Sequence, residues 1–131
     1  MNKEITTRHD IEKLIIHFYE KVRADDIIGF IFNEVVTMDW EHHTQIIIDF
    51  WESIILDNPV YQNNAMEKHY TLNSKVPLTK EHFDRWLFLF NNSVDEYFIG
   101  EKAMLAKKRA KSIADLMLFK MDNINHTKAY I

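Results

Sequence analysis

The sequence contains no cysteine and very little glycine or proline. Of its 131 residues, none is Cys, 2 are Gly and 2 are Pro. The absence of cysteine excludes disulfide scaffolds, thiol catalysis and cysteine-ligated zinc or iron–sulfur centres. The two isolated glycines, Gly29 and Gly100, cannot form a Gly-rich phosphate-binding loop. Because tight turns favour Gly and Pro, their scarcity also argues against β-sandwiches, β-barrels and disordered linkers.

Long apolar runs and a strong positive charge are also missing. The longest apolar run, Ile27 to Phe32, is too short to span a bilayer, and the first ten residues include no apolar signal region. We therefore expect a cytoplasmic protein with no membrane partner. The net charge of −4 argues against nucleic-acid binding. Residues 101–131 are locally basic, with seven Lys and Arg against three Asp and Glu, which we interpret as a solvated helix face rather than a docking patch.

Apolar residues instead recur at helical spacing along nearly the whole chain. The length predicts a single domain over residues 1–131, with a core at roughly 10–120 and a polar tail at 122–131. Four long amphipathic helices are expected, with Thr7 and Thr79 as N-caps and Gly100 as a stop signal. No segment alternates with a period of two residues, so the predicted fold class is all-α. The first expected helix carries the stripe Ile11, Leu14, Ile15, Phe18, Tyr19 and Val22.

Histidine is abundant, with seven residues, and helical phase separates two of them. At 3.6 residues per turn, His43 lies within about 40° of Ile47 on the apolar face, whereas His42 points about 100° away. An inward histidine is unfavourable unless it is hydrogen-bonded or ligated. A core histidine paired with a backbone carbonyl and a functional histidine both remain open. His69, in the long segment before Pro77, has the pattern of an ordinary exposed histidine.

Two further polar aromatic residues occupy apolar stripes. The hydroxyl of Tyr19 and the indole N–H of Trp86 need partners when they are buried. Each alone fits a packing residue. Together with His43 they predict three hydrogen-bond donors on three helices, as in a polar spot within an apolar ligand pocket.

Several catalytic classes lack their motifs. No Glu-x-x-His pair of a di-iron bundle and no His-Glu-x-x-His of a zinc protease occurs. The nucleophile elbow of a serine hydrolase is also absent. An all-α chain with usable histidines, many Phe and no Cys fits a histidine-ligated haem. A cofactor-free helical interaction module is the competing class.

Several runs, taken together, resemble the third group of truncated haemoglobins. Their joint spacing matches over roughly residues 10–120, and the lack of a Gly-Gly motif points to this group rather than the other two. The most specific block extends from His82 to Phe90 and continues with Val94-Asp95-Glu96. The other runs are Phe18-Tyr19-Glu20-Lys21-Val22-Arg23, Ile31-Phe32, Trp40-Glu41-His42-His43, Phe50-Trp51, Lys68-His69 and Ala106-Lys107-Lys108-Arg109-Ala110.

The resemblance implies a shortened globin fold, with two helices packed on two around haem b. It implies that His69 ligates the haem iron on the proximal side. On the distal side, Tyr19 would be the main donor to bound dioxygen, assisted by Trp86 and the distal histidine His43. The residues implied for the apolar haem crevice are Phe32, Ile47, Phe50, Phe83 and Phe90.

The implied function is binding of dioxygen and other diatomic ligands at ferrous iron. Each charge-assisted donor contributes about 1.5–3 kcal/mol, so several donors would slow oxygen release. Slow release suits peroxidase-like or nitric-oxide-detoxifying chemistry, with electrons from a reductase that the sequence does not identify. The alternatives are a non-catalytic oxygen or nitric-oxide binder or transporter, and the cofactor-free module. We expect a monomer.

Overall fold

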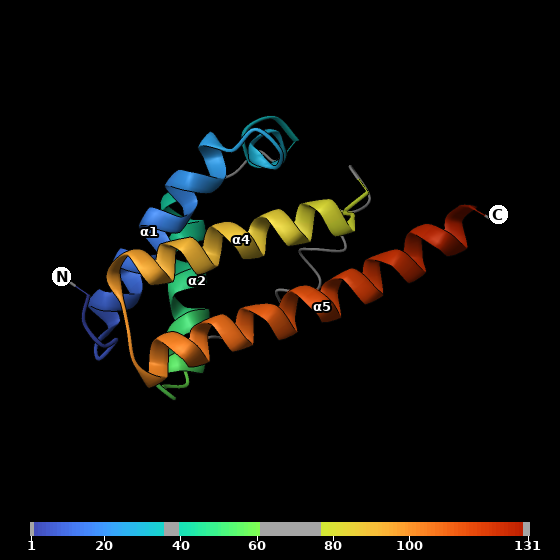
Figure 1. Cartoon of the computed structure of the whole chain (residues 1–131). Helices are drawn as coiled ribbons and strands as arrows, with labels where there is room; N and C mark the ends of the chain where they lie inside the picture. The colour runs from blue at the N-terminus through green and yellow to red at the C-terminus, as the bar shows by residue number, and fades with distance from the viewer. Residues whose placement is uncertain (1, 36–39, 61–76, 130–131) are drawn as a thin grey trace.

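The protein is built from helices that enclose one aromatic core (Figure 1). The computed structural model describes residues 2–35, 40–60 and 77–129. In these ranges the only β-pairing is an isolated bridge between Lys3 and Phe98, so the all-α prediction is confirmed. None of the described helices is long and apolar enough to cross a membrane. The elements are α1 (Arg8–Ala24), the π-helix η1 (Ile31–Val35), α2 (Trp40–Ile55), α4 (Lys80–Tyr97) and α5 (Glu101–Ala129).

The four long helices of the described ranges form two pairs that pack on each other. Helices α1 and α2 make one pair and α4 and α5 the other, with further contacts of α1 on α4 and of α2 on α5. Figure 1 shows α4 and α5 side by side and antiparallel, with α2 passing behind α4. Lys102 at the start of α5 donates from Nζ to the carbonyl of Ile55, which satisfies a free carbonyl at the end of α2. The helices are thus packed two on two, as expected.

Local sequence signals set several helix ends. Thr7 and Asp10 form a reciprocal capping box at the start of α1, as their spacing predicts. At the start of α4 the backbone N–H of Thr79 donates to Nδ1 of His82 at 3.2 Å. Gly100 has φ +96°, a left-handed conformation that glycine adopts without strain, and α5 begins at the next residue. Helix α5 continues to Ala129, so residues 122–129 of the expected polar tail are helical.

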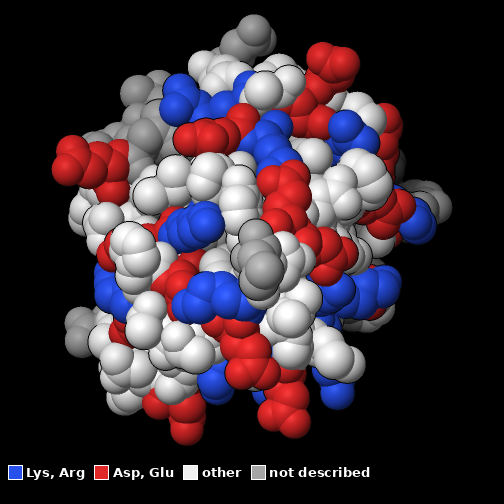
Figure 2. Space-filling view, turned by 60° about the vertical axis from the view of Figure 1, so that its left-hand side comes forward, with Lys and Arg blue, Asp and Glu red and all other residues white. Residues whose placement is uncertain are grey.

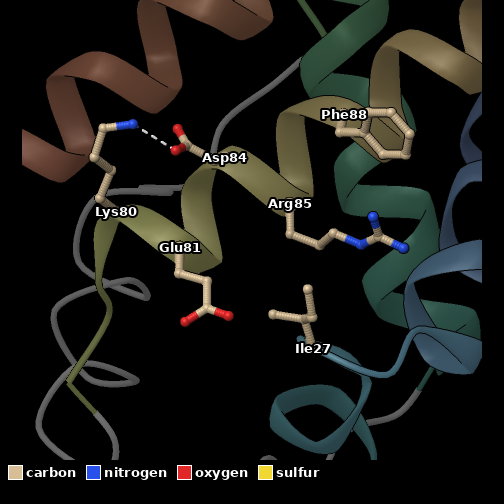
Figure 3. Close-up of a pocket in the computed structure, with 6 residues that line it drawn as sticks. All are labelled: Ile27, Lys80, Glu81, Asp84, Arg85 and Phe88. Atoms are coloured by element: carbon tan, nitrogen blue, oxygen red, sulfur yellow. Dashed lines mark hydrogen bonds and ion pairs between the residues drawn. The ribbon is translucent and has the colours of Figure 1, made fainter.

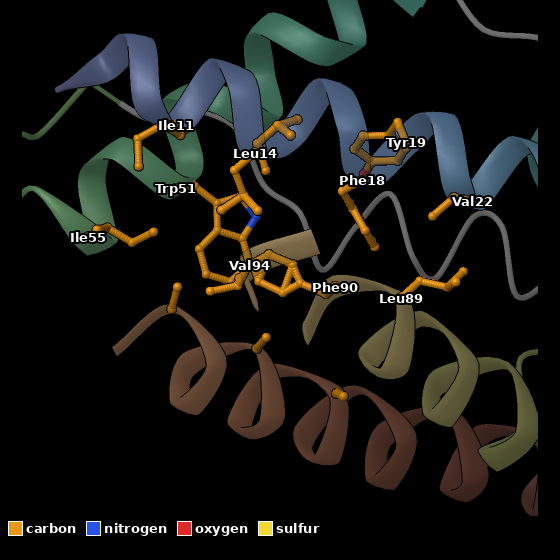
Figure 4. Close-up of a cluster of buried hydrophobic side chains, with 14 of the residues drawn as sticks. Ile11, Leu14, Phe18, Tyr19, Val22, Trp51, Ile55, Leu89, Phe90 and Val94 are labelled. Carbon is orange, nitrogen blue, oxygen red and sulfur yellow. The ribbon is translucent and has the colours of Figure 1, made fainter. Parts of the chain in front are cut away.

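The core is centred on Phe90 of α4 (Figure 4). Its fully buried ring stacks on Trp51 of α2, with ring centroids 4.6 Å apart, and on Trp86, one turn earlier, at 5.7 Å. Helix α5 meets the core with small side chains, which let its backbone approach α4 closely. Every residue of the stripe predicted for α1 is buried, as are the α5 residues Ala103, Ala106, Ala110, Ala114 and Met117.

Charges of both signs are interspersed on the surface (Figure 2). Lys107 forms an ion pair with Asp95, and Lys111 forms one with Asp115, at 2.7 Å each. Both pairs engage cations of the basic segment, which fits its interpretation as a solvated helix face. Exposed pairs of this kind contribute about 0–1 kcal/mol to stability.

Asp10 makes the folding stability depend on pH in the acidic range. Burial alone would raise its pKa, but hydrogen bonds from Lys3 and from the backbone of Thr6 and Thr7 lower the pKa from 3.8 to about 2. A carboxyl whose pKa is lower in the folded state stabilises the protein above its unfolded pKa. This stabilisation is lost as the pH falls from about 4 to about 2.

We therefore expect Asp10→Asn to flatten the acid limb of the stability curve. Over that pH range the wild-type free energy of unfolding should fall by on the order of 2 kcal/mol more than that of the variant. Urea unfolding at pH values from 2 to 6 measures the difference. Parallel acid limbs in the two proteins would show that Asp10 is not the linked group.

Candidate functional site

Tyr19 lies at the centre of the candidate site. It projects from α1 into the interior and is 8% exposed. Its ring meets His43 of α2 edge to face, with ring centroids 5.6 Å apart, and meets Phe32 of η1 at 6.1 Å. Burial raises the pKa of the Tyr19 phenol above its ordinary value. The hydroxyl therefore stays protonated at neutral pH and can act as a hydrogen-bond donor.

His43 supplies the second polar group. It is half-buried and its Nε2 atom is buried, whereas the neighbouring His42 is exposed. The prediction from helical phase that His43 faces inward and His42 does not is confirmed. The contact with Tyr19 joins a phenol and an imidazole from two helices in one place.

Trp86 lies one aromatic ring away from Tyr19. The ring of Phe18 meets Trp86 at a centroid distance of 5.7 Å and an interplanar angle of 87°, and it meets Tyr19 at 5.0 Å. Trp86 also stacks almost parallel on Phe90, which Phe18 contacts as well. The structure therefore brings Tyr19 and His43 into direct contact and links Trp86 to them through Phe18.

The residues predicted to line an apolar crevice divide into two sets. Phe32, Ile47 and Phe50 are partly buried and pack against the core, so their surfaces can still contact a ligand. Phe83 and Phe90 are buried, with exposed fractions of 9% and 0%. Phe90 supports Trp86 from behind by stacking.

The predicted proximal histidine, His69, lies outside the described residues. Among the other histidines, His82 belongs to the start of α4 and His17 packs its ring against Tyr97 at 4.7 Å. In the described part of the chain, no group of three or more His, Asp or Glu side chains could hold a metal ion.

A partly buried ion pair next to Trp86 in the sequence is not predicted by any local pattern. Arg85 of α4 donates from Nε to Oδ1 of Asp25, the residue that follows α1, at 2.7 Å. Burial alone would raise the pKa of Asp25, but hydrogen bonds from the backbone of Ile28 and from Arg85 lower it. Asp25 is therefore a carboxylate at neutral pH. No periodicity marks such a pair, because its members are 60 positions apart in the sequence.

Beside this pair lies an open hollow of about 490 Å³ (Figure 3). Its walls combine the apolar side chains of Ile27 and Phe88 with charged groups of the first turns of α4. Two of these, Lys80 and Asp84, form an ion pair with each other. The lining residues are Ile27, Lys80, Glu81, Asp84, Arg85 and Phe88.

Comparisons with curated proteins and with solved structures give results that agree with each other. No family model matches the chain. A curated relative, the group 3 truncated haemoglobin ctb of Campylobacter jejuni, is 35% identical over an alignment of 117 residues. The match covers 87% of this chain and 90% of the relative. A crystal structure of a group III truncated haemoglobin from Campylobacter jejuni has a TM-score of 0.79 and 32% sequence identity. That match covers 92% of this chain and 95% of the other.

Proposed function

The chain belongs to the group 3 truncated haemoglobins, and from this premise we propose that it binds haem b and holds dioxygen tightly. The observation that carries the proposal is the contact between the buried Tyr19 and His43, which places two polar side chains within an otherwise apolar region. A flat apolar cofactor with a polar ligand needs this combination of surfaces.

The residues present fit a haem. Aromatic and aliphatic side chains from η1, α2 and α4 offer apolar surface for the macrocycle, namely Phe32, Ile47, Phe50 and Phe83, with Phe90 behind them. His69 is the proposed proximal ligand. When bound, the haem supplies a ferrous iron that carries dioxygen or another diatomic ligand.

The chain's own contribution on the distal side is to hold hydrogen-bond donors in place. Tyr19 donates its phenolic O–H to the ligand, and its raised pKa keeps that proton on the oxygen. His43 is placed beside it to donate or accept, and Trp86 presents its indole N–H from α4. Buried donors of fixed geometry stabilise negative charge on the ligand without reorganisation.

Such donors suit redox chemistry on peroxide or nitric oxide better than oxygen transport, because they slow ligand release and stabilise charge as a bond breaks. We therefore propose a redox role, with electrons from a reductase. Steady-state turnover of peroxide or nitric oxide with an electron donor is the expected result. Oxygen binding without turnover would instead indicate a non-catalytic binder or transporter.

Titration of the purified protein with haemin tests the cofactor. We expect a stoichiometric Soret band and, after reduction, the spectrum of a histidine-ligated ferrous haem. Oxygen should then bind to the reduced protein, and its dissociation should be slow. A protein that produces no Soret band would contradict haem binding and favour the cofactor-free helical module.

A further inference from the structure

The turn after α1 is joined to α4 by the buried carboxylate of Asp25. This side chain is only 3% exposed, and that of Arg85 is 34% exposed. Oδ1 of Asp25 accepts from Nε of Arg85 at 2.7 Å, and Oδ2 accepts from the backbone N–H groups of Ile27 and Ile28, each at 3.0 Å. Both carboxylate oxygens are engaged, one by each of the two elements.

On the side of α1, these bonds hold the turn that leads to Phe32. The N–H of Gly29 also donates to the carbonyl of Asp25 at 3.0 Å. The turn is tight, because a Cβ atom on Gly29 would lie 3.0 Å from the carbonyl oxygen of Arg23. Helix η1 follows directly, and its Phe32 contacts Tyr19.

On the side of α4, the pair lies next to a proposed ligand donor. Arg85 immediately precedes Trp86, and its guanidinium group lies over the ring of Phe88 at 5.0 Å. Figure 3 shows the Arg85 side chain extending from α4 beside Ile27. Its charged end is therefore held from two directions, by Asp25 and by Phe88.

We propose that Asp25 and Arg85 are positioning residues for the ligand pocket. The pair sets the distance between α4 and the C-terminal end of α1. Helix α4 carries Trp86, and α1 carries Tyr19. It contacts no ligand and acts through the placement of Trp86. This inference rests on the proposed function, since the placement matters for ligand release only when a ligand is bound there.

The chain offers a matched control. Lys21 of α1 and Glu96 of α4 also join these two helices, at 2.7 Å, but the carboxylate of this pair is 45% exposed, whereas that of Asp25 is 3% exposed. Neither Lys21 nor Glu96 is an immediate sequence neighbour of a proposed donor. If any ion pair between α1 and α4 were equivalent, Glu96→Gln would have the same effect as loss of Arg85.

The first readout does not need haem. The full-length protein is labelled with 5-fluorotryptophan, and the ¹⁹F resonance of Trp86 is assigned with Trp86→Phe. We expect Arg85→Met to shift or broaden the Trp86 resonance, Arg85→Lys to restore part of the change, and Glu96→Gln to leave it unaltered. An unchanged Trp86 resonance in Arg85→Met would overturn the proposal. Should that variant not fold, the same comparison is made with Arg85→Lys and Asp25→Asn.

The second readout is oxygen dissociation from the reduced, haem-loaded protein. Arg85→Met should raise the rate about three- to tenfold, as expected for loss of a coupling between neighbouring groups. In the Trp86→Phe background the same substitution should have little further effect. A full effect in that background would contradict action through Trp86. A shifted ¹⁹F resonance in a protein that binds no haem would retain the positioning pair and reject the proposed function.

Discussion

Tyr19→Phe is expected to accelerate oxygen release about 10- to 100-fold, because it removes one charge-assisted hydrogen bond worth about 1.5–3 kcal/mol. The substitution deletes a single oxygen atom and keeps the ring that packs against Phe18, His43 and Phe32. The substitution should therefore change the rate of oxygen release and leave the stability of the fold nearly unchanged. Stopped-flow displacement of oxygen by carbon monoxide measures the rate directly.

The raised pKa of Tyr19 adds an expected pH profile to the same prediction. Because burial keeps the phenol protonated, the ratio of the variant and wild-type rates should stay constant between about pH 6 and pH 9. Tyr97→Phe is the matched control, since Tyr97 is half-buried at the far end of α4 and contacts His17 and Lys13. Equal dissociation rates in Tyr19→Phe and wild type would show that Tyr19 is not the donor.

The parts of the fold that follow from sequence are those set by local interactions. The stripe on α1 is predicted fully because its period matches one face of a helix. The capping box at Thr7 and Asp10 depends on residues three positions apart, so it too is visible in the sequence. Similarly, the left-handed conformation at Gly100 requires one residue type, and that residue is present.

Interactions between distant residues could not be predicted in this way. Glu52 lies on α2 among apolar residues and is 4% exposed, because Arg8 and Asn58 reach its carboxylate. Periodicity gives no reason to bury a glutamate there. The ion pair of Asp25 and Arg85 has the same character. Both depend on how α1 is placed against other helices, which is a property of the assembled core.

The candidate site, too, can be predicted only in part from local sequence. Helical phase distinguishes His43 from His42, and apolar stripes include Tyr19 and Trp86, but no local pattern shows that these side chains converge. Convergence requires the two-on-two packing and the intervening ring of Phe18. The local pattern around His69 is that of an ordinary exposed histidine, and only the family resemblance proposes it as the iron ligand.

His69→Ala is expected to abolish histidine ligation of the haem. Removal of a group that merely orients a ligand lowers metal affinity about 10- to 100-fold, so loss of the proposed iron ligand itself should weaken haem binding by at least about 100-fold. The reduced protein should lose the spectrum of a histidine-ligated haem, and added imidazole should restore it. Absorption and resonance Raman spectra of the iron–histidine stretch measure both changes.

His9→Ala provides the control for His69→Ala, because the side chain of His9 is 87% exposed on the first turn of α1. It should leave the spectrum and the haem affinity at wild-type values.

A histidine-ligated spectrum that persists in His69→Ala would contradict the proximal assignment. The inward-facing His43 would then be the first alternative ligand, because it lies beside Tyr19 and its Nε2 atom is buried. The double variant with His43→Ala would distinguish this alternative, since it should remove the remaining histidine signal only if His43 had taken the place of His69.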